Sequence, residues 1–261
     1  MFDCHLHTVV SYDGESTAQE MVNAAVKAGL KEICFTDHLD YDPLASVQTM
    51  NFDTKAYNDA YDSLYHPELK ICRGMEFGML PDNRDTFKED LKRRHFDYVI
   101  GSAHFIEGLD IYYKDYWENK TMEQAERIFL EHTLECVRVH DDFDVLGHLT
   151  YVSKLAENPT NRPVEYNAYR ELLDEILRIL VEKGKGLEVN TSGMDRCGIF
   201  LPTKDYLCRF KELGGEIVTV GSDAHHVARV GQYCRQACEL VNEVFGYVCT
   251  FEDRKPIFHR V

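Results

Sequence analysis

FDCHLHTVVSYDG, residues 2–14, combines the alternation of a β-strand with a concentration of side chains that bind metal ions. In a strand, residues i and i+2 point to the same side, so His5 and His7 direct their imidazoles the same way. Asp13 follows six positions after His7. An isolated His-x-His pair is equally compatible with a polar strand face, so the interpretation depends on the rest of the chain.

Units of one kind recur along the chain: a helical pattern is followed by a short apolar run that ends in a His, Asp or Glu. Expected helices cover residues 16–29, 54–65, 84–94, 121–140, 165–183, 203–215 and 227–245. Alternating strands and helices indicate a mainly parallel sheet with helices outside it. Seven such units without a Gly-rich dinucleotide fingerprint favour an α/β barrel over an open doubly wound sheet. Residues 247–261 are expected to form a small hairpin or a closing strand.

The composition limits the classes of protein to which the chain can belong. Its 261 residues suit one barrel, and we expect residues 1–261 to form a single domain. The formal net charge of −16 argues against partners such as long nucleic acids and anionic membranes, which usually bind basic surfaces. A small phosphate ester stays compatible, because bound metal ions supply positive charge inside an acidic shell.

The cysteines and the N-terminal residues indicate the cellular compartment of the protein. The nine cysteines are scattered and include no CxxC pair, which is typical of buried thiols in a reducing compartment. The start of the chain lacks the pattern of a signal peptide, and the sequence has no apolar run of transmembrane length. We therefore expect a cytoplasmic protein, either a monomer or a small homo-oligomer.

The candidate metal ligands follow different predicted strands, where the rim of a barrel would bring them together. They are His5, His7, Asp13, His38, Glu76, His104, His148, Asp223 and His225. Imidazole and carboxylate suit zinc, iron and manganese, and the set contains no thiolate. So many ligands suit two or three divalent ions, with a carboxylate such as Glu76 bridging two of them.

The motifs HLHT, TDH, GMEFG, GSAH, LGH and GSDAH occur in an order that resembles the PHP (polymerase and histidinol phosphatase) superfamily. The resemblance extends from His5 to about His225. The length, and the NTSG motif at residues 190–193, are similar to the stand-alone histidinol-phosphatase branch. This resemblance implies a distorted (β/α)7 barrel, the TIM-barrel-like PHP fold, and a trinuclear metal site.

The resemblance also implies how the ligands are shared. The first ion would be held by His5, His7, Glu76 and Asp223; the second by Glu76, His104 and His148; the third by Asp13, His38 and His225. Many members carry histidine where Asp13 stands, and a carboxylate is a harder ligand.

By the same resemblance, we expect a metal-dependent phosphomonoesterase that hydrolyses L-histidinol phosphate in histidine biosynthesis. A hydroxide bridging the first two ions would attack phosphorus in line. Glu76, Asp223 and His225 are the expected catalytic residues, and the candidate proton donors are His225, Asp223 and a metal-bound water. The expected phosphate-binding residues are Lys154, Arg162 and Arg196, since arginine forms a bidentate fork with phosphate. Asp40, Asp42 and Glu107 are candidates for contacting the substrate's amino group and imidazole.

Three alternatives stay open. Other PHP proteins act on nucleotide or oligonucleotide phosphates or on phosphotyrosine. Amidohydrolase-like chemistry on a C–N bond shares the His-x-His strand, but GMEFG and SDAH fit a phosphoesterase better, and no position suits a carbamylated lysine. A non-catalytic metal-binding barrel is disfavoured because every ligand position is filled.

Overall fold

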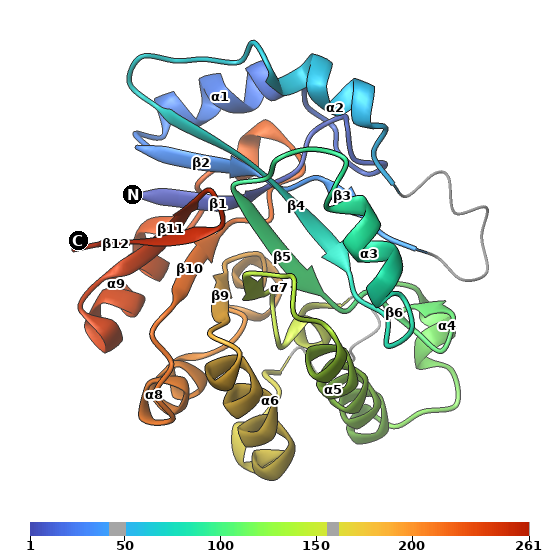
Figure 1. Cartoon of the computed structure of the whole chain (residues 1–261). Helices are drawn as coiled ribbons and strands as arrows, with labels where there is room; N and C mark the ends of the chain where they lie inside the picture. Colours follow the sequence, from blue (N-terminus) through green and yellow to red (C-terminus); the bar gives the residue numbers. More distant parts are fainter. Residues whose placement is uncertain (42–50, 156–161, 261) are drawn as a thin grey trace.

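A parallel sheet forms the centre of the computed structural model, which describes residues 1–41, 51–155 and 162–260. The strand order is β1-β2-β4-β5-β8-β9-β10, and β3 pairs with the C-terminal end of β4 (Figure 1). The strands are β1 (Phe2–Leu6), β2 (Glu32–Phe35), β3 (His38–Leu39), β4 (Lys70–Gly78), β5 (Tyr98–Ser102), β8 (Val145–Leu146), β9 (Gly186–Asn190) and β10 (Val218–Gly221).

The two ends of this sheet approach each other just beyond β1 and β10. The backbone N–H of His7 donates to the carbonyl of Ala224 at 2.9 Å, and the N–H of Asp223 donates to the carbonyl of His5 at 2.9 Å. These contacts nearly close the sheet, and the predicted distorted seven-stranded barrel is confirmed. They also bring the first and last ligand-bearing segments together.

Helices surround the sheet (Figure 1). They are α1 (Ala18–Lys27), α2 (Thr54–Tyr61), α3 (Arg84–Asp90), α4 (Lys114–Trp117), α5 (Met122–Val139), α6 (Arg170–Glu182), α7 (Met194–Cys197), α8 (Lys204–Glu212) and α9 (Cys234–Phe245). Capping boxes begin two of them: Thr17 with Glu20 in α1, and Thr121 with Gln124 in α5.

Helix α6 shows how the sequence pattern fixes the packing. Leu173, Ile176, Leu177 and Leu180 recur at helical spacing and are fully buried. Burying such a side chain contributes about 1.5–3 kcal/mol, which holds the helix on the sheet.

The last helix starts later than its apolar pattern predicts. Residues 227–229 form one 3-10 turn, and α9 begins only at Cys234. Gly231 has φ of 70° and Tyr233 has φ of 58°, both in the left-handed region, so the backbone cannot continue as one helix through them.

The end of the barrel opposite the ligands is covered by the C-terminal hairpin, β11 (Val248–Glu252) and β12 (Lys255–His259). The N–H of Arg254 donates to the carbonyl of Asp97, just before β5, and the rings of Phe2 and His259 lie 4.4 Å apart. The tail is thus a hairpin, and the chain ends near its start.

The interior is packed between these two ends. The hydroxyl groups of Tyr98 on β5 and Thr219 on β10 are 2.9 Å apart, and both side chains are buried. At the open rim, a short hairpin of β6 (Phe105–Ile106) and β7 (Leu109–Asp110) follows β5. This hairpin places Asp110 beside the ligand-bearing rim.

Candidate metal centre

The first group of donor atoms joins β1 to the loop after β10. Nε2 of His5 lies 3.0 Å from Nε2 of His7 and 3.1 Å from Oε2 of Glu76. Nε2 of His7 lies 3.5 Å from Oδ1 of Asp223. One atom from each of these residues falls within 4.8 Å of all the others, and the side chains are almost completely buried. Strand alternation on β1 directs both imidazoles into the same space.

The second group uses the other oxygen of Glu76. Oε1 lies 2.8 Å from Nε2 of His148 and 3.2 Å from Nε2 of His104. The hydroxyl of Ser102 donates to the same oxygen at 2.7 Å. Glu76 therefore faces the first group with Oε2 and the second with Oε1, the arrangement needed for a carboxylate that bridges two ions.

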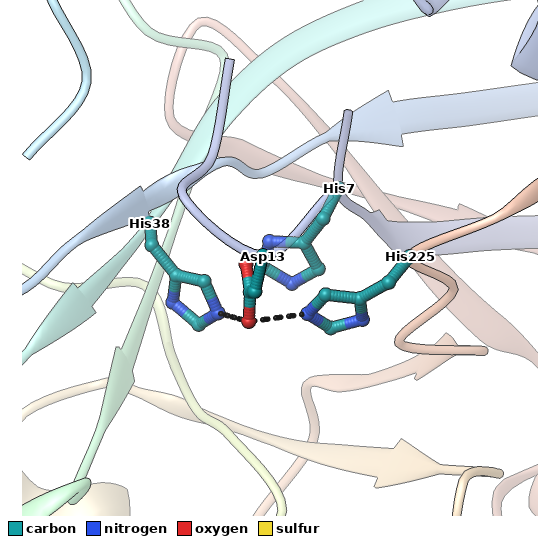
Figure 2. Close-up of side chains that lie close together, drawn as sticks. All are labelled: His7, Asp13, His38 and His225. Atoms are coloured by element: carbon teal, nitrogen blue, oxygen red, sulfur yellow. Dashed lines mark ion pairs between the residues drawn. The ribbon is translucent and has the colours of Figure 1, made fainter. Parts of the chain in front are cut away.

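The third group lies nearer the surface, and Figure 2 shows its four side chains. Oδ2 of Asp13 lies 3.1 Å from Nε2 of His225 and 3.5 Å from Nε2 of His38. His7 lies between these histidines, with ring centroids 4.2 Å from each. His7 thus belongs to two donor groups, a sharing that the sequence motifs did not indicate.

The described residues also place Asp40 beside this centre. Its Oδ1 lies 3.0 Å from Nδ1 of His104, and its Oδ2 lies 3.2 Å from Nδ1 of His38. A Cβ on Gly78 would lie 1.8 Å from Oδ1 of Asp40, so the glycine leaves room for this carboxylate. Burial raises the pKa of Asp40, but His104 and His38 lower it to about 2. Asp40 is therefore an anionic partner that orients histidines, a common arrangement in metal sites.

Electrostatics keep the carboxylate donors and one imidazole, that of His7, in the forms that bind cations. Burial raises the pKa of Glu76, but neighbouring imidazoles, His5 foremost, bring it well below its usual value. Burial also raises the pKa of Asp223, and the Lys154 ammonium and His5 lower it by more. Burial and nearby imidazoles lower the pKa of His7. Ionised carboxylates and a neutral imidazole are the forms that ligate divalent ions.

The donor set fits divalent ions. It contains only imidazole nitrogens and carboxylate oxygens, which suit zinc, manganese or iron. The facing Nε2 atoms of His5 and His7 lie 3.0 Å apart and need a shared partner. A cation in the first group would satisfy both atoms.

A cavity of about 370 Å³ opens above the donor groups. Its floor includes members of all three groups. Its walls are formed by Tyr12, Asp110, Tyr112, Tyr113, Tyr151 and Lys154. Asp110 is the only carboxylate of the described lining outside the three groups, and no sequence motif distinguishes it.

Among the expected phosphate-binding residues, Lys154 lines this cavity. Its Nζ lies 2.8 Å from Oδ2 of Asp223 and 2.7 Å from Oγ of Ser192. The ammonium also lies 4.6 Å from the ring centre of Tyr151. This places a fixed positive charge at the edge of the first donor group.

The two arginines lie outside the described lining. Arg162 pairs with Glu126 at 3.3 Å, on the side of α5. Arg196 on α7 donates to the backbone carbonyl of Lys154 at 3.1 Å. Each would have to turn away from its present partner to contact a phosphate in the cavity.

Asp37 anchors the loop after β1. It accepts hydrogen bonds from the N–H of Thr8 and the hydroxyl of Ser11, each at 2.8 Å. Oγ of Ser11 in turn lies 3.3 Å from Nδ1 of His7. Asp37 therefore acts on the histidine only through this loop.

Other acidic candidates lie elsewhere. Glu107 is not among the described residues that line the cavity. Asp42 falls outside the described residues.

One buried carboxylate that sequence reasoning missed is Glu188 on β9, whose Oε1 lies 2.6 Å from Nδ1 of His5. A signal was present: LEVN places a charged residue between Leu187 and Val189 in an apolar strand. Such a residue must either face water or meet a buried partner.

Comparison with known proteins identifies the class. The PHP domain model matches residues 3–192, and the chain belongs to the PHP domain family. It is 30% identical to a protein named probable histidinol-phosphatase of Clostridium acetobutylicum, covering 99% of this chain and 96% of that protein. It is also 30% identical to the histidinol-phosphatase of Lactococcus lactis subsp. lactis, covering 97% and 95%. The resemblance indicated by the motifs is confirmed.

The fold agrees with a solved relative. The crystal structure of histidinol phosphate phosphatase from Lactococcus lactis subsp. lactis, complexed with zinc, L-histidinol and phosphate, matches with a TM-score of 0.88. The two are 28% identical, and the match covers 98% of each chain. In the part of the chain that the structure describes, no helix has the length and apolar character required to cross a membrane.

Proposed function

We propose that this protein is a metal-dependent phosphomonoesterase that hydrolyses L-histidinol phosphate to L-histidinol and phosphate. The observation that carries the proposal is Glu76, whose two oxygens each face a different imidazole group on the floor of one cavity. The near full-length similarity to proteins named histidinol-phosphatase supports the choice of substrate.

The three donor groups would hold two or three divalent ions, with zinc, manganese or iron as candidates. His5, His7, Glu76 and Asp223 would hold the first ion. Glu76 with His104 and His148 would hold the second, and Asp13, His38 and His225 the third. When bound, such ions supply an activated water and neutralise charge on the phosphate.

One wall of the cavity suits the phosphate. Lys154 presents an ammonium whose present partners are Asp223 and Ser192. An incoming phosphate can share this ammonium, because Lys carries three donors. Lys154 would therefore orient the phosphate over the donor groups and stabilise charge that develops on its oxygens. Arg162 and Arg196 remain proposed additional phosphate contacts from the segments around the cavity.

The other wall suits the amino-alcohol part of the substrate. L-histidinol phosphate carries an amino group and an imidazole. Asp110 supplies a carboxylate to this wall. Tyr12 and Tyr112 also line the wall, and their exposed fractions are 49% and 52%. Large exposed aromatic side chains at the mouth of a cavity indicate a binding surface. We propose that the tyrosine rings stack on the imidazole and that Asp110 pairs with the amine.

Hydrolysis also requires a proton for the leaving alkoxide. Asp223 and His225 line the cavity on the side of Lys154, and Oδ2 of Asp13 lies 3.1 Å from Nε2 of His225. We propose that His225 delivers the proton, because Asp223 is ionised and pairs with Lys154. Glu76 would contribute to catalysis by holding the two donor groups together.

The chain would work as one domain, residues 1–261, in the cytoplasm, as a monomer or a small homo-oligomer. A small phosphate ester would be its partner, because the net charge of −16 disfavours long polyanions.

The test is a substrate profile. Purified protein would be assayed at fixed Mn²⁺ or Zn²⁺ with L-histidinol phosphate, an aryl phosphate, a nucleoside monophosphate and a phosphotyrosine peptide. The proposal expects kcat/KM of about 10⁴ M⁻¹s⁻¹ or more for L-histidinol phosphate. It also expects the other esters to be slower by at least an order of magnitude. Faster turnover of the nucleotide or of phosphotyrosine would assign another PHP substrate.

A further inference from the structure

A carboxylate outside the three donor groups forms hydrogen bonds to a member of two of them. Glu188 is fully buried on β9, and its Oε1 lies 2.6 Å from Nδ1 of His5. Its Oε2 accepts a hydrogen bond from the backbone N–H of His148 at 2.9 Å. His5 belongs to the first donor group and His148 to the second, so one side chain contacts a member of each.

We propose that Glu188 is a positioning residue that orients the ligands of both ion sites before metal binds. The proposal rests on the metal binding put forward under the proposed function, and it is independent of which phosphate ester is hydrolysed.

The contact with Glu188 determines which ring nitrogen of His5 carries the proton. A carboxylate accepts hydrogen bonds and cannot donate them when ionised, so Nδ1 of His5 carries the proton that points at Glu188. In the neutral ring Nε2 then holds the lone pair, and this is the atom that faces His7 and Glu76. The contact also fixes the plane of the ring, as carboxylate–histidine pairs do behind metal ions.

Two glycines next to Glu188 leave room for its carboxylate. A Cβ on Gly221 of β10 would lie 2.5 Å from Oε1 of Glu188 and 2.3 Å from Cβ of His5. A Cβ on Gly147 would lie 3.6 Å from Oε2 of Glu188 and 2.4 Å from Oγ of Ser102. Glycine at these positions lets the neighbouring strands approach closely enough for Glu188 to reach both histidines.

Hydrogen bonds of the segment 190–192 connect Glu188 to Asp223. Nδ2 of Asn190 donates to Oε2 of Glu188 at 3.2 Å, and the N–H of Ser192 donates to Oδ1 of Asn190 at 3.0 Å. Oγ of Ser192 lies 3.2 Å from Oδ2 of Asp223 and also contacts Lys154. The segment 190–192 therefore extends the support from Glu188 to a further ligand of the first group.

The variant Glu188→Gln tests the proposal. Glutamine keeps the size of the side chain but has only one acceptor oxygen, so it cannot serve both His5 and His148. The matched control is Asp144→Asn. Asp144 is a buried carboxylate toward the opposite end of the barrel, where it accepts from the N–H of Val99 and pairs with Arg254.

Each protein would be stripped with a chelator and titrated with Co²⁺, with binding followed by visible absorption. The proposal expects Glu188→Gln to bind Co²⁺ about 10- to 100-fold more weakly, with a changed absorption spectrum, because loss of such a partner typically has that effect. Asp144→Asn should bind like the wild type. A folded Glu188→Gln with wild-type affinity and spectrum would overturn the proposal, as would equal losses in both variants.

A second measurement does not depend on the variant's folding. In metal-free wild-type protein, ¹⁵N NMR of the imidazoles should find the proton of His5 on Nδ1, in a strong hydrogen bond. A proton absent from Nδ1 would overturn the proposal. Neither readout uses turnover, so a chain that binds Co²⁺ but leaves L-histidinol phosphate intact would reject only the proposed substrate.

Discussion

The ammonium of Lys154 lies 2.8 Å from Oδ2 of Asp223. Asp223 belongs to the first donor group through its other oxygen, Oδ1. One carboxylate thus links the donor groups at the floor of the cavity to the only Lys or Arg that the structure describes in its lining. A phosphate that contacts the floor would therefore also lie within reach of a positive charge.

Replacing Lys154 with methionine should lower kcat/KM for L-histidinol phosphate about 10- to 100-fold, because a hydrogen bond to a charged group contributes about 1.5–3 kcal/mol. Metal content should stay at the wild-type level. Steady-state kinetics and elemental analysis would check both. Lys204→Met is the control, since Lys204 pairs with Glu243 away from the cavity. Equal activity of the two variants would remove Lys154 from substrate binding.

Asp110→Asn should discriminate between substrates. We expect KM for L-histidinol phosphate to rise about 5- to 30-fold, equivalent to a loss of about 1–2 kcal/mol from one ionic contact. An aryl phosphate lacks the amine, so its KM should not change. Asp115→Asn in α4 is the control for a lost negative charge. A parallel rise of both KM values would show that Asp110 does not recognise the amine.

His7 belongs to two donor groups, so His7→Ala should reduce metal content and phosphate release together. We expect activity to fall by at least about 100-fold, which is more than the loss of a residue that only hydrogen-bonds to a ligand would cause. Elemental analysis and phosphate release would be measured on the same preparation. His66→Ala, which changes a histidine outside the donor groups, should leave both unchanged. Full activity of His7→Ala would disprove the ligand assignment.

Acid stability can be predicted from Asp174, which is remote from the donor groups. Hydrogen bonds from Arg209 foremost, and from Tyr166, lower the pKa of Asp174 to about 2 although burial opposes them. A carboxyl whose pKa is lower in the folded state stabilises the protein above its unfolded pKa of about 4. That contribution is lost as the pH falls from about 4 to about 2.

Asp174→Asn should therefore reduce the free energy of unfolding by about 1 kcal/mol at pH 7, given the partly exposed partners. The difference between variant and wild type should shrink below pH 4. Urea unfolding of metal-free protein at pH 7 and pH 3 would measure it. A difference that stays constant between these pH values would contradict the assigned pKa.

Much of the site was predictable because barrel geometry gathers the residues that follow parallel strands. His38, Glu76, His104 and His148 each come at or just after the end of a strand, so their convergence follows from the fold. Sequence spacing alone does not show which neighbouring strands pair, and the sharing of His7 between two groups depends on that pairing.

The carboxylates that contact the metal-ligating histidines or line the cavity are harder to predict. The sequence predicts a role in substrate recognition for Asp40, yet this side chain is buried against His104, in space that Gly78 leaves free. Glu188 and Asp110 are single carboxylates in a strand and a short hairpin, and their roles appear only when distant segments pack together. Arg162 and Arg196 follow barrel strands near the rim, but the direction in which a side chain points cannot be read from its position in the sequence.

Phosphate release from L-histidinol phosphate tests the account most directly, measured on wild-type protein before chelation, after chelation, and after re-addition of Mn²⁺, Zn²⁺ or Fe²⁺. The account predicts turnover that disappears with the metal and returns with at least one of these ions. Turnover that persists in demonstrably metal-free protein, or no turnover with any of the ions, would contradict it.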